Sequence, residues 1–138
     1  MIINFQEIKS LDDFEYLRTL RNKTYIRINS LNKKKVSKKD HKNWLDKNKK
    51  NKIFILKDKK KNIGYIRIDE KKFVSWALEK KYWGKIKFAD YLKKTINNKK
   101  FTYFCEIIRN NIRSQIVALK AGFQFDKSKE NIIRFKKN

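Results

Sequence analysis

Few side chains of this chain could carry out acid–base chemistry near neutral pH. His41 is the single histidine, and imidazole is the side chain whose ordinary pKa lies closest to neutrality. Its spacing to Trp44 places both side chains on one face of a predicted helix. We expect His41 to be either a proton acceptor beside a ligand pocket or a surface histidine packed against Trp44.

Two neighbouring residues of a predicted strand offer a carboxylate and a thiol. Glu106 could take up a proton through water, or it could instead pair with a lysine or arginine. Cys105 has no histidine near it in sequence, so we expect a small buried hydrophobic residue rather than a nucleophile. Glu79 ends another predicted strand and is expected to be a solvated charge. With one cysteine and one histidine, neither an internal disulfide nor a histidine-rich metal site is expected.

The charge of the chain is strongly positive. It has 38 Lys and Arg against 14 Asp and Glu, a net charge of +24, which favours association with polyanions. However, only 7 of the 38 are arginine, the residue that reads phosphates and bases with a planar fork, and the lysines are scattered along the chain. We interpret most of this charge as the solvated surface of a basic protein, which leaves nucleic acid binding open without making it the expected activity.

The length and composition indicate one folded domain. The 138 residues are 40% hydrophobic, enough for a core, and we assign residues 1–138 to a single domain. No apolar segment approaches the roughly 20 residues of a membrane span, and the first residues lack the features of a signal peptide. We therefore expect a cytoplasmic protein without membrane contacts.

The hydrophobic pattern predicts alternating strands and helices. Strands are expected at 2–5, 53–56, 63–68, 73–78, 102–108, 123–125 and 132–135. Helices are expected from 11 to 20 and after 37, both begun by serine caps, and around 88–96 and 112–119, with 21–36 irregular. In the last helix, Ile112, Ile116 and Leu119 are expected to face the core. Short links predict antiparallel hairpins, and the crossover helix predicts parallel pairing. The fold class is therefore α/β, a mixed sheet with helices on both faces, in the order β-α-α-β-β-β-α-β-α-β-β.

Three stretches resemble the GCN5-related N-acetyltransferases (GNAT), and together they span nearly the whole chain. Residues 63–85 look like that family's central hairpin, cofactor strand and start of its pyrophosphate loop. Residues 105–123 contain Asn111-x-x-Ser114 and end in Lys120-Ala121-Gly122-Phe123, similar to the family's strand-to-helix segment. Residues 20–45 are similar to the branch that acetylates amino groups on nucleotide-linked sugars.

The resemblance implies the GNAT (acyl-CoA N-acyltransferase) fold and a function. It implies an N-acetyltransferase, monomeric or homodimeric, that moves an acetyl group from the co-substrate acetyl-CoA to a small-molecule primary amine, possibly carried on an amino-sugar nucleotide. Glu106 and His41 are then the catalytic candidates. The implied cofactor-binding residues are Trp76, Ala77, Leu78, Trp83, Gly84, Lys85, Ile86, Lys87, Phe88, Asn111 and Ser114. The implied acceptor-binding residues are Arg21, Asn22, Arg27 and Trp44. A backbone N–H near Ala77 or Leu78 would stabilise the thioester oxyanion.

Three positions depart from the family pattern. Ile86 and Phe88 stand where the phosphate loop usually has glycine or alanine, and a β-branched residue resists left-handed backbone angles. Ala118 replaces a frequent tyrosine acid, so Tyr82 or water would have to donate the proton. The alternative function is a weakly active or inactive GNAT-fold protein that binds a polyanion or a protein. Either way, catalysis requires the strands at 74–78 and 102–107 to part midway and leave room for the cofactor between them.

Overall fold

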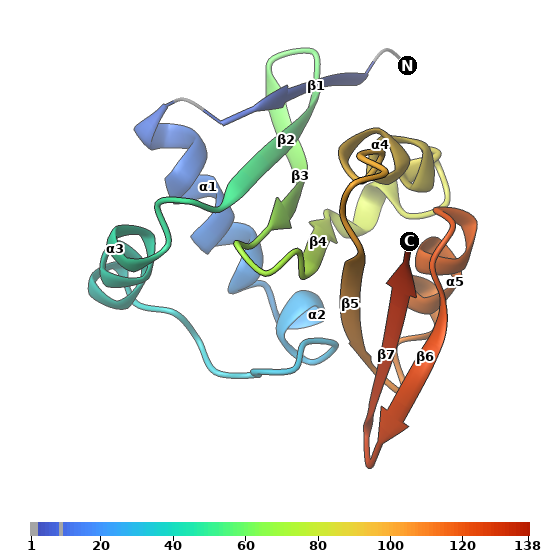
Figure 1. Ribbon diagram of the computed structural model, residues 1–138. Coiled ribbons are helices and arrows are strands. Elements are labelled where there is room, and N and C mark those ends of the chain that lie inside the picture. The colour runs from blue at the N-terminus through green and yellow to red at the C-terminus, as the bar shows by residue number, and fades with distance from the viewer. Residues whose placement is uncertain (1–2, 9) are drawn as a thin grey trace.

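The computed structural model describes residues 3–8 and 10–138 (Figure 1). Its elements follow the expected order with two additions: the short helix α2, in a segment expected to be irregular, and a 3-10 helix after β4. Ile2, the first residue of the first predicted strand, lies outside the described residues. In chain order the elements are β1 (Ile3–Glu7), α1 (Leu11–Arg21), α2 (Thr24–Arg27), α3 (Lys38–Lys47), β2 (Lys52–Asp58), β3 (Lys61–Ile68), β4 (Val74–Leu78), the 3-10 helix η1 (Lys80–Tyr82), α4 (Phe88–Thr95), β5 (Tyr103–Ile108), α5 (Ile112–Lys120), β6 (Gln124–Lys129) and β7 (Ile132–Lys137).

The two predicted serine caps are confirmed. The Ser10 hydroxyl accepts a hydrogen bond from the backbone N–H of Asp13 at 3.2 Å, and the Ser37 hydroxyl accepts one from Asp40 at 3.1 Å. Each cap satisfies an N–H group that a helix start leaves without an intrahelical partner. The caps therefore fix where α1 and α3 begin, and with them the positions of Arg21 and His41.

The strands form two antiparallel sheets joined at one point. The first has the order β1-β2-β3-β4 and the second the order β5-β7-β6. A single parallel bridge between Phe73 and Phe104 connects them in the described residues, with the Phe104 N–H donating to the Lys72 carbonyl at 3.0 Å. Figure 1 shows β4 and β5 side by side at the centre of the molecule. The parallel direction predicted for the crossover is confirmed, but the expected continuous sheet is divided here.

The first sheet is covered on both faces, as predicted. Ile63 and Ile66 on β3 belong to the main core with Phe88 and Leu92 of α4. Tyr65, between them in sequence, packs on the opposite face in a smaller core made of Ile8, Leu17, Ile53 and Ile55 together with Phe14, Tyr16 and Trp44. This alternation is the period-two pattern of a strand buried on both sides. It directs Tyr65 and Arg67 toward the face where α1 and α3 lie.

The predicted core face of α5 is wrong. Ile112, Ile116 and Leu119 are 58%, 47% and 55% exposed, whereas Ala118 is fully buried. The helix has two apolar stripes, and the one with the smaller residue packs inward because alanine allows the helix to approach the sheet closely. Gly122, with φ of 100°, ends the helix as expected. Among the described residues, no helix combines the length and apolar character needed to cross a membrane.

Candidate functional site

Beyond Phe73, no strand of the described residues pairs with the outer edge of β4. The Glu79 N–H donates to the Ile63 carbonyl at 2.8 Å, and the Asp69 N–H donates to the Phe73 carbonyl at 2.9 Å. Together with the β3–β4 register, these two bonds show which residues of β4 hydrogen-bond to β3, because hydrogen-bonded and non-hydrogen-bonded pairs alternate along an antiparallel ladder. Ala77 bonds to β3, whereas Trp76 and Leu78 direct their N–H and C=O groups away from it. Of the two candidate oxyanion donors, Leu78 is therefore the one that faces the gap between the sheets.

The facing edge of β5 is also open. Arg109 donates its N–H to the Asn131 carbonyl at 2.8 Å, so in the β5–β7 pair the backbone groups of Glu106 lie on the side away from β7. The two edges meet at the Phe73–Phe104 bridge and no ladder continues beyond it in the described chain. The separation of strands that the sequence reading required is therefore present.

A cavity of about 960 Å³, here called the α5 cavity, opens between β4, the segment before α4, and α5. Ten of the eleven predicted cofactor-binding residues line it, and Lys85 does not. Those ten are Trp76, Ala77, Leu78, Trp83, Gly84, Ile86, Lys87, Phe88, Asn111 and Ser114. Basic side chains outnumber acidic ones on its wall, with Lys87, Lys93, Arg113 and Lys120 against Asp90. The cavity is suited to a molecule with negative charge.

The backbone before α4 leaves hydrogen-bond donors toward this cavity. Within the described residues, the N–H groups of Ile86, Lys87 and Phe88 donate to no backbone or side-chain acceptor. Free N–H groups at a helix start attract phosphates. The left-handed backbone angle falls at Gly84, with φ of 74°, and Ile86 is not among the residues with positive φ. The strain expected at Ile86 is therefore absent, and its side chain packs against the main core.

Trp83 is held at the wall of the α5 cavity by a hydrogen bond of its indole N–H and by contacts of its ring with two side chains. Its indole N–H donates to the Leu78 carbonyl at 2.9 Å. The Arg113 guanidinium lies over its ring at 3.7 Å from the centroid, and Tyr25 meets it edge-on at 5.5 Å. Trp83 therefore connects the end of β4 with α5 across the cavity.

A second cavity of about 600 Å³, here called the α3 cavity, adjoins the first. Arg21, Trp44, His41 and Glu106, four of the residues predicted to act on the acceptor, line it. Several residues line both cavities, which places the free edge of β4 between them: Ile26, Asn29, Ser30, Trp76, Asn111 and Ser114. A group entering through one cavity can therefore meet a group entering through the other.

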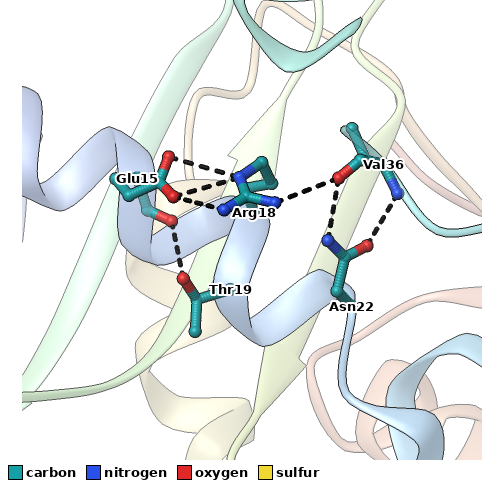
Figure 2. A network of polar contacts seen from close by, with 5 residues as sticks. All are labelled: Glu15, Arg18, Thr19, Asn22 and Val36. Carbon is teal, nitrogen blue, oxygen red and sulfur yellow. Dashed lines mark hydrogen bonds and ion pairs between the residues drawn. The ribbon is translucent and has the colours of Figure 1, made fainter. Parts of the chain in front are cut away.

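Two predicted acceptor-binding residues instead hold the loop that follows α2. The Asn22 side chain exchanges two hydrogen bonds of 2.8 Å with the backbone of Val36, which also accepts from Arg18 at 3.3 Å (Figure 2). Arg27 donates to the carbonyls of Asn22 and Lys33. Neither Asn22 nor Arg27 lines the α3 cavity or the α5 cavity, and the bonded groups of both residues are used by the backbone. Their role toward the acceptor stays a prediction that these contacts do not support.

Asn111 connects the two halves of the site. Its Oδ1 accepts from the Ser114 N–H at 3.2 Å, capping α5, and its Nδ2 donates to the Asn29 carbonyl at 3.1 Å. Because Asn29 and Asn111 line both cavities, this bond fixes the loop after α2 against the start of α5. The polar groups of Asn111 are thus engaged within the protein.

The carboxylates of Glu106 and Glu79 lie in different surroundings. Glu106 faces its cross-strand partner Arg134 at 3.4 Å, the ion pair that was the alternative to a free base, and it also lines the α3 cavity. Glu79 was expected to be solvated, but the residue is half-buried and its Oε2 is buried without a hydrogen-bond partner in the described chain. Cys105 is buried as predicted, and burial raises the pKa of its thiol to about 12.

Tyr82 cannot readily act as the proton donor that the sequence suggested. Its hydroxyl donates to the Asp58 carboxylate at 2.8 Å, and this bond raises the pKa of the phenol. Tyr82 lines neither cavity. Tyr82 is therefore not placed to protonate a leaving group in either cavity.

His41 lies parallel to Trp44, with ring centroids 6.1 Å apart and an interplanar angle of 6°. The packed-histidine interpretation is therefore correct in geometry, and the residue still lines the α3 cavity. Partial burial lowers the pKa of His41 below its ordinary value of 6.5; the negative charge of Glu15 opposes this shift, and the positive charge of Arg18 adds to it. At neutral pH the imidazole is uncharged and able to accept a proton.

The lowered pKa of His41 predicts a pH dependence of stability. The unfolded chain takes up a proton at His41 more readily than the native chain does, so the free energy of unfolding should rise with pH through the range below 6.5. We expect the urea midpoint of the wild type to rise between about pH 5 and pH 7, and His41→Gln to show a smaller rise. Identical pH dependence in both proteins would contradict this.

Tyr65 and Arg67 line the α3 cavity and were missed by the sequence reading. Arg67 donates from Nε to the Ser75 hydroxyl at 3.0 Å and lies over the Trp44 ring at 5.0 Å. A signal was present, since these two polar residues alternate with the buried Ile66 along β3. It indicates a polar patch on one face of the strand, but not that the patch borders a cavity.

No protein-family model matches the chain, and no curated protein matches its sequence. Solved structures do match along its whole length. A domain from Methanocaldococcus jannaschii has a TM-score of 0.82 at 21% identity, with 99% of this chain and 98% of that chain covered. Spermidine N-acetyltransferase from Vibrio cholerae, in complex with CoA and spermine, has a TM-score of 0.77 at 13% identity, covering 97% of this chain and 92% of that one.

The GNAT domain of the S. lividans protein PAT has a TM-score of 0.74 at 13% identity, with 97% of this chain and 89% of that chain covered. In the present chain, no group of three or more metal-ligating side chains gathers among the described residues. The divided sheet, the free edge of β4 and these structural matches lead to one conclusion: the chain has the GNAT fold.

Proposed function

We propose that this chain transfers the acetyl group of acetyl-CoA to a primary amine. The observation that carries the proposal is the unpaired edge of β4, with Leu78 facing the gap where the two cavities meet. The α5 cavity would take the cofactor, because its free N–H groups before α4 and its basic wall suit a pyrophosphate. The α3 cavity would take the amine.

The residues of the chain can then be given roles. Trp76 presents a backbone N–H and a carbonyl that can pair with an amide of an extended cofactor arm. The Leu78 N–H would donate to the thioester oxygen as negative charge develops there. When the C–N bond forms and the C–S bond breaks, Glu106 or His41 would accept the ammonium proton through water. The departing thiolate takes its proton from water, and the product is an amide.

We further propose that the amine belongs to a negatively charged molecule such as an amino-sugar nucleotide. Besides the segment at 20–45, the charge of the α3 cavity supports this acceptor class. Arg18, Arg21, Lys34, Lys35 and Arg67 line it against Asp40 and Glu106. A polycation such as spermine, the ligand of the V. cholerae structure, would be repelled by such a wall.

Thermal denaturation with acetyl-CoA tests the proposal. At 100 times its dissociation constant a ligand adds about 2.7 kcal/mol to stability, which should raise Tm by several degrees. Adenosine 3′,5′-bisphosphate is the matched control, since it carries phosphates but no pantetheine arm, and should have a smaller effect. Release of free thiol on addition of an amine then reports transfer itself.

An unchanged Tm at millimolar acetyl-CoA would contradict the proposed function. If nucleic acid was retained at the same time, with a steep dependence on salt concentration, the net charge of +24 would instead support the polyanion-binding alternative.

A further inference from the structure

Two guanidinium groups line the α3 cavity without a carboxylate partner. Arg21 donates from Nη2 to the Asn32 carbonyl, and its Nη1 is buried with no hydrogen-bond partner in the described chain. Arg67 uses Nε for the Ser75 hydroxyl. Neither arginine forms an ion pair with any described residue. A buried N–H of a cation without an acceptor is costly, so each such group calls for an explanation.

These groups also lie near one another. Burial lowers the pKa of Arg21, and the positive charges of Arg27 and Arg67 lower it further. Burial raises the pKa of the Tyr65 phenol, and both Arg21 and Arg67 oppose that rise. Tyr65 and Arg67 occupy the same face of β3, and α1 ends at Arg21 above that face. The structure therefore gathers two positive charges around the Tyr65 phenol, and no carboxylate of residues 3–8 or 10–138 forms an ion pair with either of them.

The acidic groups close to this patch do not neutralise it. Glu15 is paired with Arg18, and Glu106 is paired with Arg134. Asp40 lies in the first turn of α3, where the helix dipole favours its charge. Like charges held together in a partly desolvated cavity destabilise the empty protein, and an anion bound between them would relieve that cost.

We propose that Arg21 and Arg67 bind an oxyanion carried by the amine acceptor, a phosphate or a carboxylate, with the Tyr65 hydroxyl as an additional donor. Guanidinium forks fit both groups, because each presents two oxygens in a plane. The inference rests on the proposed function and adds to it the place where the acceptor is anchored.

The anchor and the free edge of β4 belong to the same cavity. Arg21 and Arg67 line the α3 cavity together with Trp76 and Ser114, which also line the α5 cavity. An acceptor whose anion is held by the two arginines would therefore lie in the cavity that the edge of β4 borders. The acceptor is then an amine that carries an anionic group.

Calorimetric titration without cofactor tests this anchor directly. The probes are four amines. Glucosamine 6-phosphate carries a phosphate, galactosaminuronic acid carries a carboxylate, glucosamine carries no anionic group, and spermidine is a polycation. We expect at least one anionic sugar to bind about 10- to 100-fold more tightly than glucosamine, and Arg67→Gln to remove most of that difference. Arg67→Lys should restore part of it, because the charge returns without the fork.

Arg109→Gln is the matched control. Arg109 donates to the Glu130 carbonyl and lines neither cavity, so its loss removes the same charge at a distance from the site. Equal binding of anionic sugars and glucosamine, or equal weakening by Arg67→Gln and Arg109→Gln, would overturn the proposal. Anion binding at Arg67 without any acetyl transfer would instead refute the proposed function while leaving the anchor in place.

Discussion

Replacing Leu78 with proline is expected to lower kcat by roughly 10²- to 10³-fold while the protein stays folded. Proline removes one N–H group, and the Leu78 N–H points toward the gap between the sheets and not into the β3–β4 ladder. Proline is tolerated in a strand where its N–H would face away from the neighbouring strand. The substitution should therefore weaken stabilisation of the oxyanion and leave the hydrogen bonds between β3 and β4 in place. Thiol release under saturating acetyl-CoA measures the rate.

Leu78→Ala is the control for this experiment, because it removes the same side chain and keeps the N–H. Both variants should lose similar stability in urea, and only the proline variant should lose the larger part of kcat. Ala77→Pro should behave in the opposite way and unfold, since Ala77 bonds to β3. Equal rates for Leu78→Pro and Leu78→Ala would show that this N–H has no part in the reaction.

Gly64→Ala is expected to lower the free energy of unfolding by about 1–3 kcal/mol. A Cβ added at Gly64 would lie 2.8 Å from the carbonyl oxygen of Ala77 and 3.0 Å from Cδ1 of Leu78. A backbone oxygen cannot move aside without shifting β4, so the same substitution should also weaken acetyl-CoA binding. Urea denaturation measures the first effect and calorimetric titration the second.

Gly84→Ala separates crowding from backbone strain. Nothing lies within 4 Å of a Cβ added there, but φ is 74°, an angle that costs a non-glycine residue about 1 kcal/mol. We expect the variant at Gly64 to be the less stable of the two. A loss at Gly64 of no more than a few tenths of a kcal/mol would mean that β4 moves away freely, and the close approach would then carry no cost.

Local patterns predicted most of the elements, because their signals lie within a few residues of each other. Ser10 and Ser37 each fix a helix start through a hydroxyl three residues before the N–H that it caps. The face of α5 was wrong because its two apolar stripes look alike in sequence. Choosing between Ile116 and Ala118 requires knowing how closely the helix approaches the sheet, which depends on residues far away in the chain.

The site was predictable where a motif fixes backbone position and less so where side chains choose distant partners. Gly84 and Asn111 were singled out by their motifs, and both line the α5 cavity. Asn22 was assigned to a ligand, yet it bonds to Val36, 14 residues away. Arg67 was overlooked because its partners, Ser75 and Trp44, come together only when β3, β4 and α3 have assembled.

The contact at Phe73 and Phe104 has a mechanical consequence. The two rings stack with centroids 5.2 Å apart at the point where the backbones of the two sheets meet. Rotating one sheet against the other about this pivot would break no hydrogen bond within either ladder, and side-chain packing in the shared interior is what resists it. The angle between the sheets is therefore held by side-chain packing and not by a hydrogen-bonded ladder, and a ligand that contacts β4 and α5 together would restrain it.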